Sequence, residues 1–281
     1  MPTNDDYSTL LDLFIRLVQS QAGQRIEPGE QWLDDAQTLS IKLFRHLVSM
    51  QTLAAGATVE QDGVPTVFFI DHASTKVIAR ATLETYLVFF YLYGCADRSL
   101  SEFRHKTWRL GGLVDRQGLH TSTADHRAIL IAEKQKLDPL RSEIEASPHI
   151  QVYTKKQRVK LLGGDWRIGK SWADLGANAG LHPKYFSDVY GYLCGYSHAS
   201  YASAMQVGQA KSIEDQRMLA QPILGFGVVI MAHFAFTYSN VFSSAGVVLS
   251  ASPDAKRVAD KWRFGADDMA TIYDSQSLAE R

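Results

Sequence analysis

The sequence predicts an all-α protein, a single multi-helix bundle arranged around long buried central helices. Apolar residues recur at three- and four-residue spacing through most of the chain, which is the period of an amphipathic helix. The chain shows no convincing strand alternation, internal repeat or low-complexity tract. With 281 residues, 46% of them hydrophobic and 21% charged, it has the composition of an ordered globular protein. We therefore expect one helical domain over residues 1–281.

The N-terminal part is expected to form a helical pair within residues 5–55. One apolar stripe follows Leu10 to Val18, and a second follows Ala36 to Met50. The loop between them contains Pro28 and Gly29, which end helices.

The core of the bundle is expected to span residues 66–250 and to contain two long helices. The first is predicted over Thr66–Tyr93, because the weakly extended run Val64–Ile70 leads directly into a helical pattern. The second is predicted over Ser212–Leu249, and Ser212 and Asp215 have the spacing of a capping pair.

Shorter helices are expected around these two. Ser99-Leu-Ser-Glu102 has the form of a capping box and predicts a helix start. Thr123 is expected to cap a helix over Ala124–Ala146. The remaining predicted helical segments are 151–162, 171–187 and the C-terminal 253–272.

The apolar segment 222–249 has two interpretations. No Asp, Glu, Lys or Arg occurs from Gln221 to Pro253, and the segment is long enough to span a bilayer. Its polar residues, including His233 and Asn240, favour a buried central helix, because polar groups inside a membrane are costly. We expect the buried helix, with membrane association as the alternative.

Charge and known motifs exclude several classes of protein. The net charge of -1 gives no support to nucleic-acid binding by bulk electrostatics. The sequence contains no phosphate-binding, dinucleotide-binding, nucleophile-elbow or zinc-protease motif, so we expect neither a cofactor nor a metal. The acidic N-terminus lacks the basic start of a signal peptide, which predicts a cytoplasmic location.

Arg80 and Glu84 form the first candidate site. They lie one helical turn apart in an apolar stretch, where an unpaired charge is costly. Either they form a structural ion pair that joins helices, or Arg80 binds a phosphate that Glu84 helps to orient.

The second candidate site is the segment Tyr190-Gly-Tyr-Leu-Cys-Gly-Tyr-Ser-His198-Ala-Ser200. Small and aromatic residues around one histidine predict a tightly packed environment. His198 is then either a satisfied core residue or a general acid–base group. We expect Arg80, Glu84 and His198 to converge in an interior polar pocket. The neighbouring residues expected to bind a ligand are His72, Ser74, Tyr190 and Ser197.

A third segment, residues 171–187, has the pattern of a helix-turn-helix unit. A short helix, a turn at Gly180 and a second helix opened by Pro183 fit the arrangement that reads DNA. The second helix offers only Lys184 as a cation, whereas a regulator needs several phosphate contacts.

The motifs at Arg80–Glu84 and at Tyr190–His198 resemble those of an uncharacterised bacterial family of helical domains. In that family an Arg-x3-Glu helix precedes a Tyr-x-x-Leu-Ser-x-x-x-His motif, and Cys194 stands at the position of the serine. The resemblance covers residues 68–250, and the family has no assigned reaction. The chain is more distantly similar to HEPN domains, many of which are RNases or toxin components. Their hallmark is an arginine shortly before a histidine, whereas no arginine closely precedes His198.

This resemblance implies a HEPN-like domain of a bacterial defence or stress module. Its expected activity is phosphodiester cleavage in RNA or a nucleotide, with His198 as general acid–base and Arg80 on the phosphate. A homodimer or a partner protein would be compatible with such a role. The alternatives are a non-enzymatic helical binding or sensor protein, a regulator that uses residues 171–187, and a membrane-associated protein that uses residues 222–249.

Overall fold

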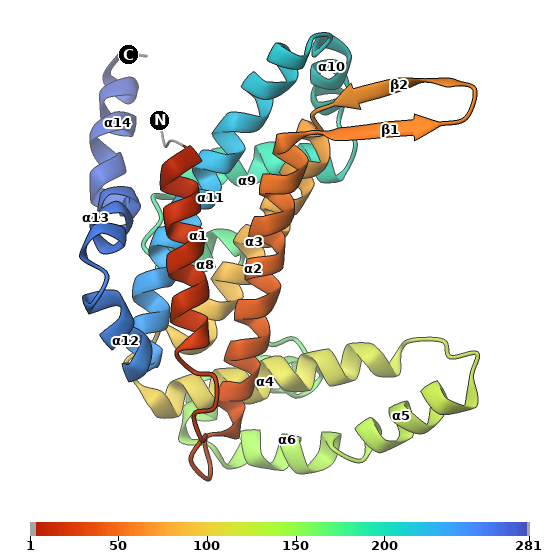
Figure 1. The fold of residues 1–281 in the computed structure, drawn as a ribbon. Coiled ribbons are helices and arrows are strands. Elements are labelled where there is room, and N and C mark those ends of the chain that lie inside the picture. Colours follow the sequence, from red (N-terminus) through yellow and green to blue (C-terminus); the bar gives the residue numbers. More distant parts are fainter. Residues whose placement is uncertain (1–3, 280–281) are drawn as a thin grey trace. The chain divides into compact units, whose positions relative to one another are not determined.

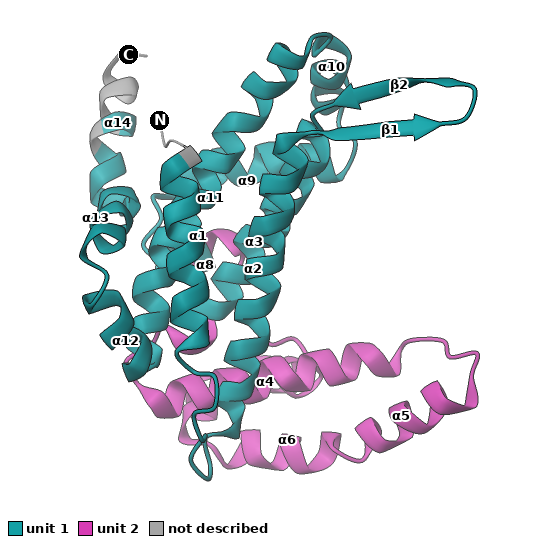
Figure 2. Cartoon of the chain, in the orientation of Figure 1, with its two compact units in different colours: residues 1–90, 175–281 teal, residues 91–174 magenta. Residues whose placement is uncertain are grey.

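A computed structural model describes residues 4–279 and divides the chain into two compact units. Unit 1 comprises Met1–Phe90 and Leu175–Arg281, and unit 2 comprises Tyr91–Asp174 (Figure 2). Helices dominate both units, which confirms the predicted all-α class. The single domain over residues 1–281 stays a prediction.

Unit 1 contains most of the helices, which are labelled in Figure 1. In chain order they are α1 (Asn4–Gln19), the 3₁₀ turn η1 (Gln31–Leu33), α2 (Asp34–Ala55), α3 (His72–Tyr93), α8 (Trp172–Asn178), α9 (Pro183–Ser197), α10 (Tyr201–Gln209), α11 (Ile213–Val241), α12 (Ser243–Ser250), α13 (Pro253–Trp262) and α14 (Ala266–Ala279). Helix α3 belongs to unit 1 up to Phe90, and helix α8 belongs to it from Leu175 onward.

Helix α11 is the central helix of unit 1. It packs against α1, α2, α12 and α13, and Figure 1 shows α1 and α2 running beside it. Every residue from Phe226 to Ala235 is buried, so the helix is covered on all sides there. The ring of Phe234 stacks on that of Phe14 at 4.1 Å. The expected long buried central helix is therefore present.

Among the described residues, one helix has the length and the apolar composition to cross a membrane, and this helix is α11. Within its most apolar window, 67% of the residues are buried inside the protein.

The start of the first long helix differs from the expectation. Residues Ala57–Gln61 (β1) and Val64–Phe69 (β2) form an antiparallel hairpin, in which Val59 pairs with Val67. Gly63, with φ of 78°, supplies the turn, and β-branched and aromatic residues favour strands. Helix α3 then begins at His72 instead of Thr66, because the Asp71 carboxylate accepts a hydrogen bond from the Ser74 amide and caps the helix.

Three other predicted helices are interrupted, and the one expected over 253–272 divides into α13 and α14 after Trp262. The segment expected over Ser212–Leu249 breaks at Phe242, whose backbone is extended and whose ring packs on Tyr238. The segment expected over Ala124–Ala146 divides before Leu137, because Pro139 has no N–H for the Gln135 carbonyl. The Ser212 hydroxyl accepts a hydrogen bond from the Asp215 amide, and the Thr123 hydroxyl accepts one from the His126 amide. Both predicted caps are therefore confirmed.

Unit 2 has its own apolar core. Its elements are α4 (Arg98–Gln117), α5 (Ala124–Lys134), α6 (Leu137–Ala146), the 3₁₀ turn η2 (Pro148–Val152) and α7 (Lys155–Leu162). Helix α4 is capped by Asp97, which accepts from the Leu100 amide, and not by the Ser99 box. Buried residues from α4, α6 and α7 form the core, including Phe103, Ile144 and Leu161.

Two adjacent glycines of α4 offer a test of this packing. A methyl group added at Gly111 would lie 2.7 Å from the Gly164 carbonyl oxygen, whereas one added at Gly112 would meet no atom within 4 Å. We expect Gly111→Ala to destabilise unit 2 by about 1–3 kcal/mol through overpacking. Gly112→Ala is the matched control and should be neutral or stabilising by up to about 1 kcal/mol. Calorimetric unfolding measures both, and equal melting temperatures would contradict the packing of α4 on the Gly164 turn.

Candidate functional site

Four polar residues recur at one-turn spacing along α3. His72, Lys76, Arg80 and Glu84 are each four residues apart, so they share one face of the helix. This face contacts α9 through the side chains of Tyr190, Tyr196 and His198. The residues that were predicted to converge therefore come from α3 and from the C-terminal end of α9.

The local geometry of the His198 segment follows from the end of α9. Ala199 has a φ of 51°, and the Ser200 amide donates to the Gly195 carbonyl at 2.8 Å, which is the pattern of a Schellman cap. An added methyl group at Gly195 would lie 2.9 Å from the Ser200 hydroxyl, so glycine permits this close turn. The cap ends the helix at Ser197 and places His198 at its C-terminus.

Arg80 is the centre of the candidate site. Its Nε donates to Glu84 Oε1 at 3.0 Å, and its Nη1 lies 3.1 Å from His198 Nε2. Its Nη2 donates to the Tyr190 hydroxyl at 3.4 Å, and that hydroxyl donates to Glu84 Oε1 at 2.8 Å. These four side chains, hereafter the Arg80 cluster, form a closed network that fixes the plane of the guanidinium.

The Arg80 cluster defines which atoms carry protons. An arginine guanidinium has only donors, so His198 Nε2 must accept and is unprotonated in this arrangement. Burial lowers the pKa of Arg80, but the hydrogen bond to Tyr190 and the charge of Glu84 raise it above its ordinary value. Burial and the hydrogen bond to Glu84 raise the pKa of Tyr190 to about 12. The cluster therefore holds a permanent cation, a neutral phenol and an imidazole nitrogen whose lone pair accepts from Arg80.

The Arg80 cluster is open to solvent, which corrects the expected interior pocket. The side chains of Arg80 and Glu84 are 22% and 26% exposed, and His198 is exposed instead of tightly packed. The small and aromatic residues around His198 are explained by the helix end and by the packing of α9. A dissolved ligand can reach the Arg80–His198 pair.

A second polar group lies one turn earlier on α3. Lys76 is fully buried, and its Nζ lies 3.0 Å from His72 Nδ1 and 4.4 Å from the ring centroid of Tyr196. Within the described part of the chain, no carboxylate lies within salt-bridge distance of this ammonium. Burial lowers the pKa of Lys76 to about 8, and burial and the Lys76 charge lower that of His72.

The other residues expected to bind a ligand lie outside the Arg80 cluster. His72 is 4% exposed and faces Lys76. The Ser197 hydroxyl donates to the Leu193 carbonyl of its own helix, and Ser74 lies in the first turn of α3. Among the described residues, no hydrogen bond joins the side chain of Ser74 or Ser197 to Arg80.

The segment 171–187 forms a short helix, a turn and a second helix. Gly180, with φ of 82°, lies in the turn, and the His182 side chain caps α9 by accepting from the Tyr185 amide. The ammonium of Lys184 lies 2.9 Å from Asp188, which leaves less of its charge for a phosphate. In residues 4–279, no group of three or more His, Cys, Asp or Glu side chains could hold a metal ion.

The fold and the site thus define a helical protein with a solvent-reachable Arg–His–Tyr–Glu cluster. Comparisons found no matching family model, no matching curated protein and no matching solved structure.

Sequence reasoning missed Lys76 and the apolar side chains that surround α9. Lys76 follows His72 and precedes Arg80 at one-turn spacing, and this periodicity was the available signal. The cavity lined by Tyr185, Tyr192 and Phe226 joins helices that are distant in sequence, so no local pattern marks it.

Proposed function

We propose that the Arg80 cluster binds a phosphate group of RNA or a nucleotide and cleaves a phosphodiester bond in it. The observation that carries this proposal is the 3.1 Å contact between Arg80 Nη1 and His198 Nε2. It places a cation and a basic nitrogen side by side at an exposed helix end. Such a pair can accept a proton and stabilise the charge that develops on a phosphate, which are two contributions to phosphoryl transfer.

The geometry assigns a role to each member of the cluster. Three N–H groups of Arg80 contact Glu84, His198 and Tyr190, and a guanidinium has five. The remaining two, together with the one that contacts His198 once a phosphate displaces that contact, can bind non-bridging phosphate oxygens and stabilise the charge that develops on them. Glu84 and Tyr190 hold the guanidinium in place and act as positioning residues.

His198 would serve as the general base. In RNA, the 2′ oxygen forms a bond to phosphorus while the bond from phosphorus to the 5′ oxygen breaks. The proton of the 2′ hydroxyl passes to His198 Nε2, which is free to accept it once the phosphate takes over the Arg80 N–H. Water supplies the proton for the leaving oxygen.

This activity would place the chain among HEPN-like helical domains of bacterial defence or stress modules. The helical fold and the Arg–His pair support the proposal. The cation comes from α3, and the histidine from the end of α9. The Arg80 cluster would thus bring together from two helices the arginine and the histidine that the HEPN hallmark carries close together in sequence.

His198→Ala tests the proposal. We expect the rate of RNA cleavage by the purified protein to fall at least about a hundredfold, which is the usual contribution of a general acid–base group. Because His198 is exposed, the melting temperature should change little. RNA cleavage is followed by gel electrophoresis, and growth of cells expressing each variant is compared.

His120→Ala is the matched control, because His120 is another exposed histidine, in unit 2. Its cleavage rate and cell growth should equal those of the wild type. Cleavage that persists in His198→Ala would refute the catalytic role. Phosphate-dependent binding of RNA without cleavage in the wild type would favour the alternative of a binding or sensor protein.

A further inference from the structure

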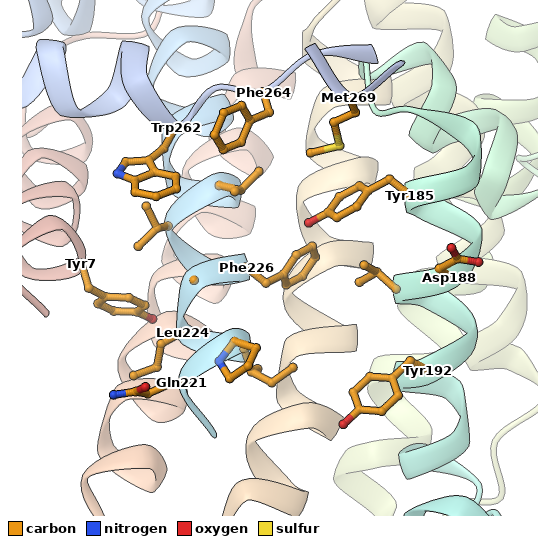
Figure 3. Close-up of a pocket in the computed structure, with 16 residues that line it drawn as sticks. Tyr7, Tyr185, Asp188, Tyr192, Gln221, Leu224, Phe226, Trp262, Phe264 and Met269 are labelled. Atoms are coloured by element: carbon orange, nitrogen blue, oxygen red, sulfur yellow. The ribbon is translucent and has the colours of Figure 1, made fainter. Parts of the chain in front are cut away.

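A large apolar cavity lies in unit 1 between α9 and α11. Its volume is about 760 Å³, within the range of pockets that enclose small molecules. Tyr185 and Tyr192 point into it from α9, Phe226 points into it from α11, and Trp262, Phe264 and Met269 close one end (Figure 3). The Arg80 cluster is not part of its lining.

The sequence of α11 is unusual where it borders this cavity. The wall that α11 contributes comprises Gln221–Phe226, Val228 and Val229, and it includes Pro222 and Gly225. Inside a helix, proline lowers helix stability by about 3 kcal/mol and glycine by about 1 kcal/mol relative to alanine. Pro222 also has no N–H to donate to the carbonyl of Met218. Such local costs are typical of functional positions, and both residues line the cavity.

The charges of the lining restrict the ligand. Asp188 is the one charged side chain among the described residues that line the cavity, and its carboxylate is paired with Lys184 at 2.9 Å. No cation lines the cavity within residues 4–279, so the charge of a bound anion would be desolvated without a partner. Aromatic faces, which are electron-rich, disfavour an anion further. The lining therefore suits an uncharged ligand.

A polar group that points into the space between α9 and α11 is available to orient such a ligand. The Tyr185 hydroxyl points toward the space between α9 and α11 (Figure 3) and makes no hydrogen bond within the part of the chain that the structure describes. Burial raises the pKa of Tyr185 to about 12, so the phenol keeps its proton and can donate. The Tyr7 hydroxyl, by contrast, donates to the Leu47 carbonyl at 2.8 Å.

We propose that this cavity binds an uncharged, mainly apolar small molecule with one hydrogen-bond acceptor, which the Tyr185 hydroxyl holds. The ligand would lie between the aromatic side chains of α9 and α11. Its binding is independent of phosphodiester cleavage, since the cavity and the Arg80 cluster use different side chains of α9.

Three naphthalene dyes test the class of ligand with the full-length chain. N-phenyl-1-naphthylamine is uncharged, 1-anilinonaphthalene-8-sulfonate adds a sulfonate to the same skeleton, and 6-propionyl-2-dimethylaminonaphthalene is uncharged with a carbonyl acceptor. We expect saturable fluorescence with both uncharged dyes and at least about tenfold weaker binding of the sulfonate, because its charge would lack a partner. Equal or tighter binding of the sulfonate, or no binding of the uncharged dyes, would overturn the proposal.

Two variants locate the site. Gly225→Leu adds a side chain at the cavity wall and a better helix former, so dye binding should be lost without a lower melting temperature. Tyr185→Phe should weaken the carbonyl dye about fivefold, as for one lost hydrogen bond, and leave N-phenyl-1-naphthylamine unchanged. Tyr201→Phe, at a tyrosine that is 85% exposed and outside the lining, is the matched control.

Unchanged dye binding in Gly225→Leu would show that the dyes bind elsewhere and would overturn the assignment. If Gly225→Leu fails to fold, a competition experiment decides whether the dyes bind in the cavity. The two uncharged dyes compete for binding to Tyr185→Phe and to the wild type. A dimer that dissociates when the dye binds would show that a second copy occupies the cavity, which would also overturn the proposal.

Discussion

Replacing Arg80 by alanine is expected to reduce phosphodiester cleavage about a thousandfold, the largest effect of any single change in the Arg80 cluster. Removing one preorganised donor of transition-state charge typically costs a factor of about 10²–10³. Arg80 also positions His198 through the 3.1 Å contact, so its loss removes two contributions. Single-turnover cleavage of a short RNA measures the effect, and phosphate binding should weaken in parallel.

Arg80→Lys and Arg217→Ala complete this experiment. Lysine keeps the charge but cannot contact Glu84, His198 and Tyr190 with one planar group, so we expect activity between those of wild type and Arg80→Ala. Arg217 forms an exposed pair with Glu214, and Arg217→Ala should retain full activity. If Arg80→Ala cleaves RNA at the wild-type rate, the Arg80 cluster is a structural network that joins α3 to α9.

Replacing Lys76 by methionine is expected to stabilise the protein at pH 7 by about 2 kcal/mol. Burial lowers the pKa of Lys76 from 10.5 to about 8, which corresponds to roughly 3 kcal/mol of burial penalty on the charged form. The variant removes this penalty but leaves His72 Nδ1 without its partner, at about 1 kcal/mol. Urea unfolding of both proteins at pH 7 measures the difference.

The pH dependence identifies the cause of this effect. Between pH 8 and 10.5 the unfolded chain holds a proton on Lys76 that the folded chain has released, so the free energy of unfolding of the wild type rises with pH relative to the variant. The advantage of Lys76→Met should therefore disappear by about pH 10, whereas exposed Lys211 replaced by methionine should show no such trend. A variant less stable than wild type at pH 7 would mean that the rings of Tyr192 and Tyr196 stabilise the ammonium more than burial destabilises it.

The candidate site was partly predictable from local patterns. The four-residue spacing of Arg80 and Glu84 predicts their ion pair, and the helix end at His198 is indicated by glycine and small residues. The exposure of His198 was not predictable, because Gly, Tyr and Ala are as compatible with a capped helix end as with a packed interior. That distinction depends on the positive φ of Ala199 and on which neighbours cover the turn.

The hairpin at residues 57–69 illustrates the same limit for the fold. Its apolar residues are largely exposed, so the usual alternation between a buried and a solvated face is absent. The break at Phe242 likewise depends on the contact of its ring with Tyr238. Local propensity at Phe242 is weak, so a tertiary contact decides where the helix is interrupted.

The sequence by itself determined the helical class, the central apolar helix, the caps at Thr123 and Ser212, and the turn-by-turn spacing of polar residues on α3. These features depend on interactions between residues close in sequence. Only the tertiary structure decided that α9 crosses this face of α3, that Lys76 is buried there with no carboxylate of the described residues beside it, and that α9 and α11 line a cavity. Packing of helices distant in sequence determines which side chains meet and which remain open to solvent, and no local pattern encodes that.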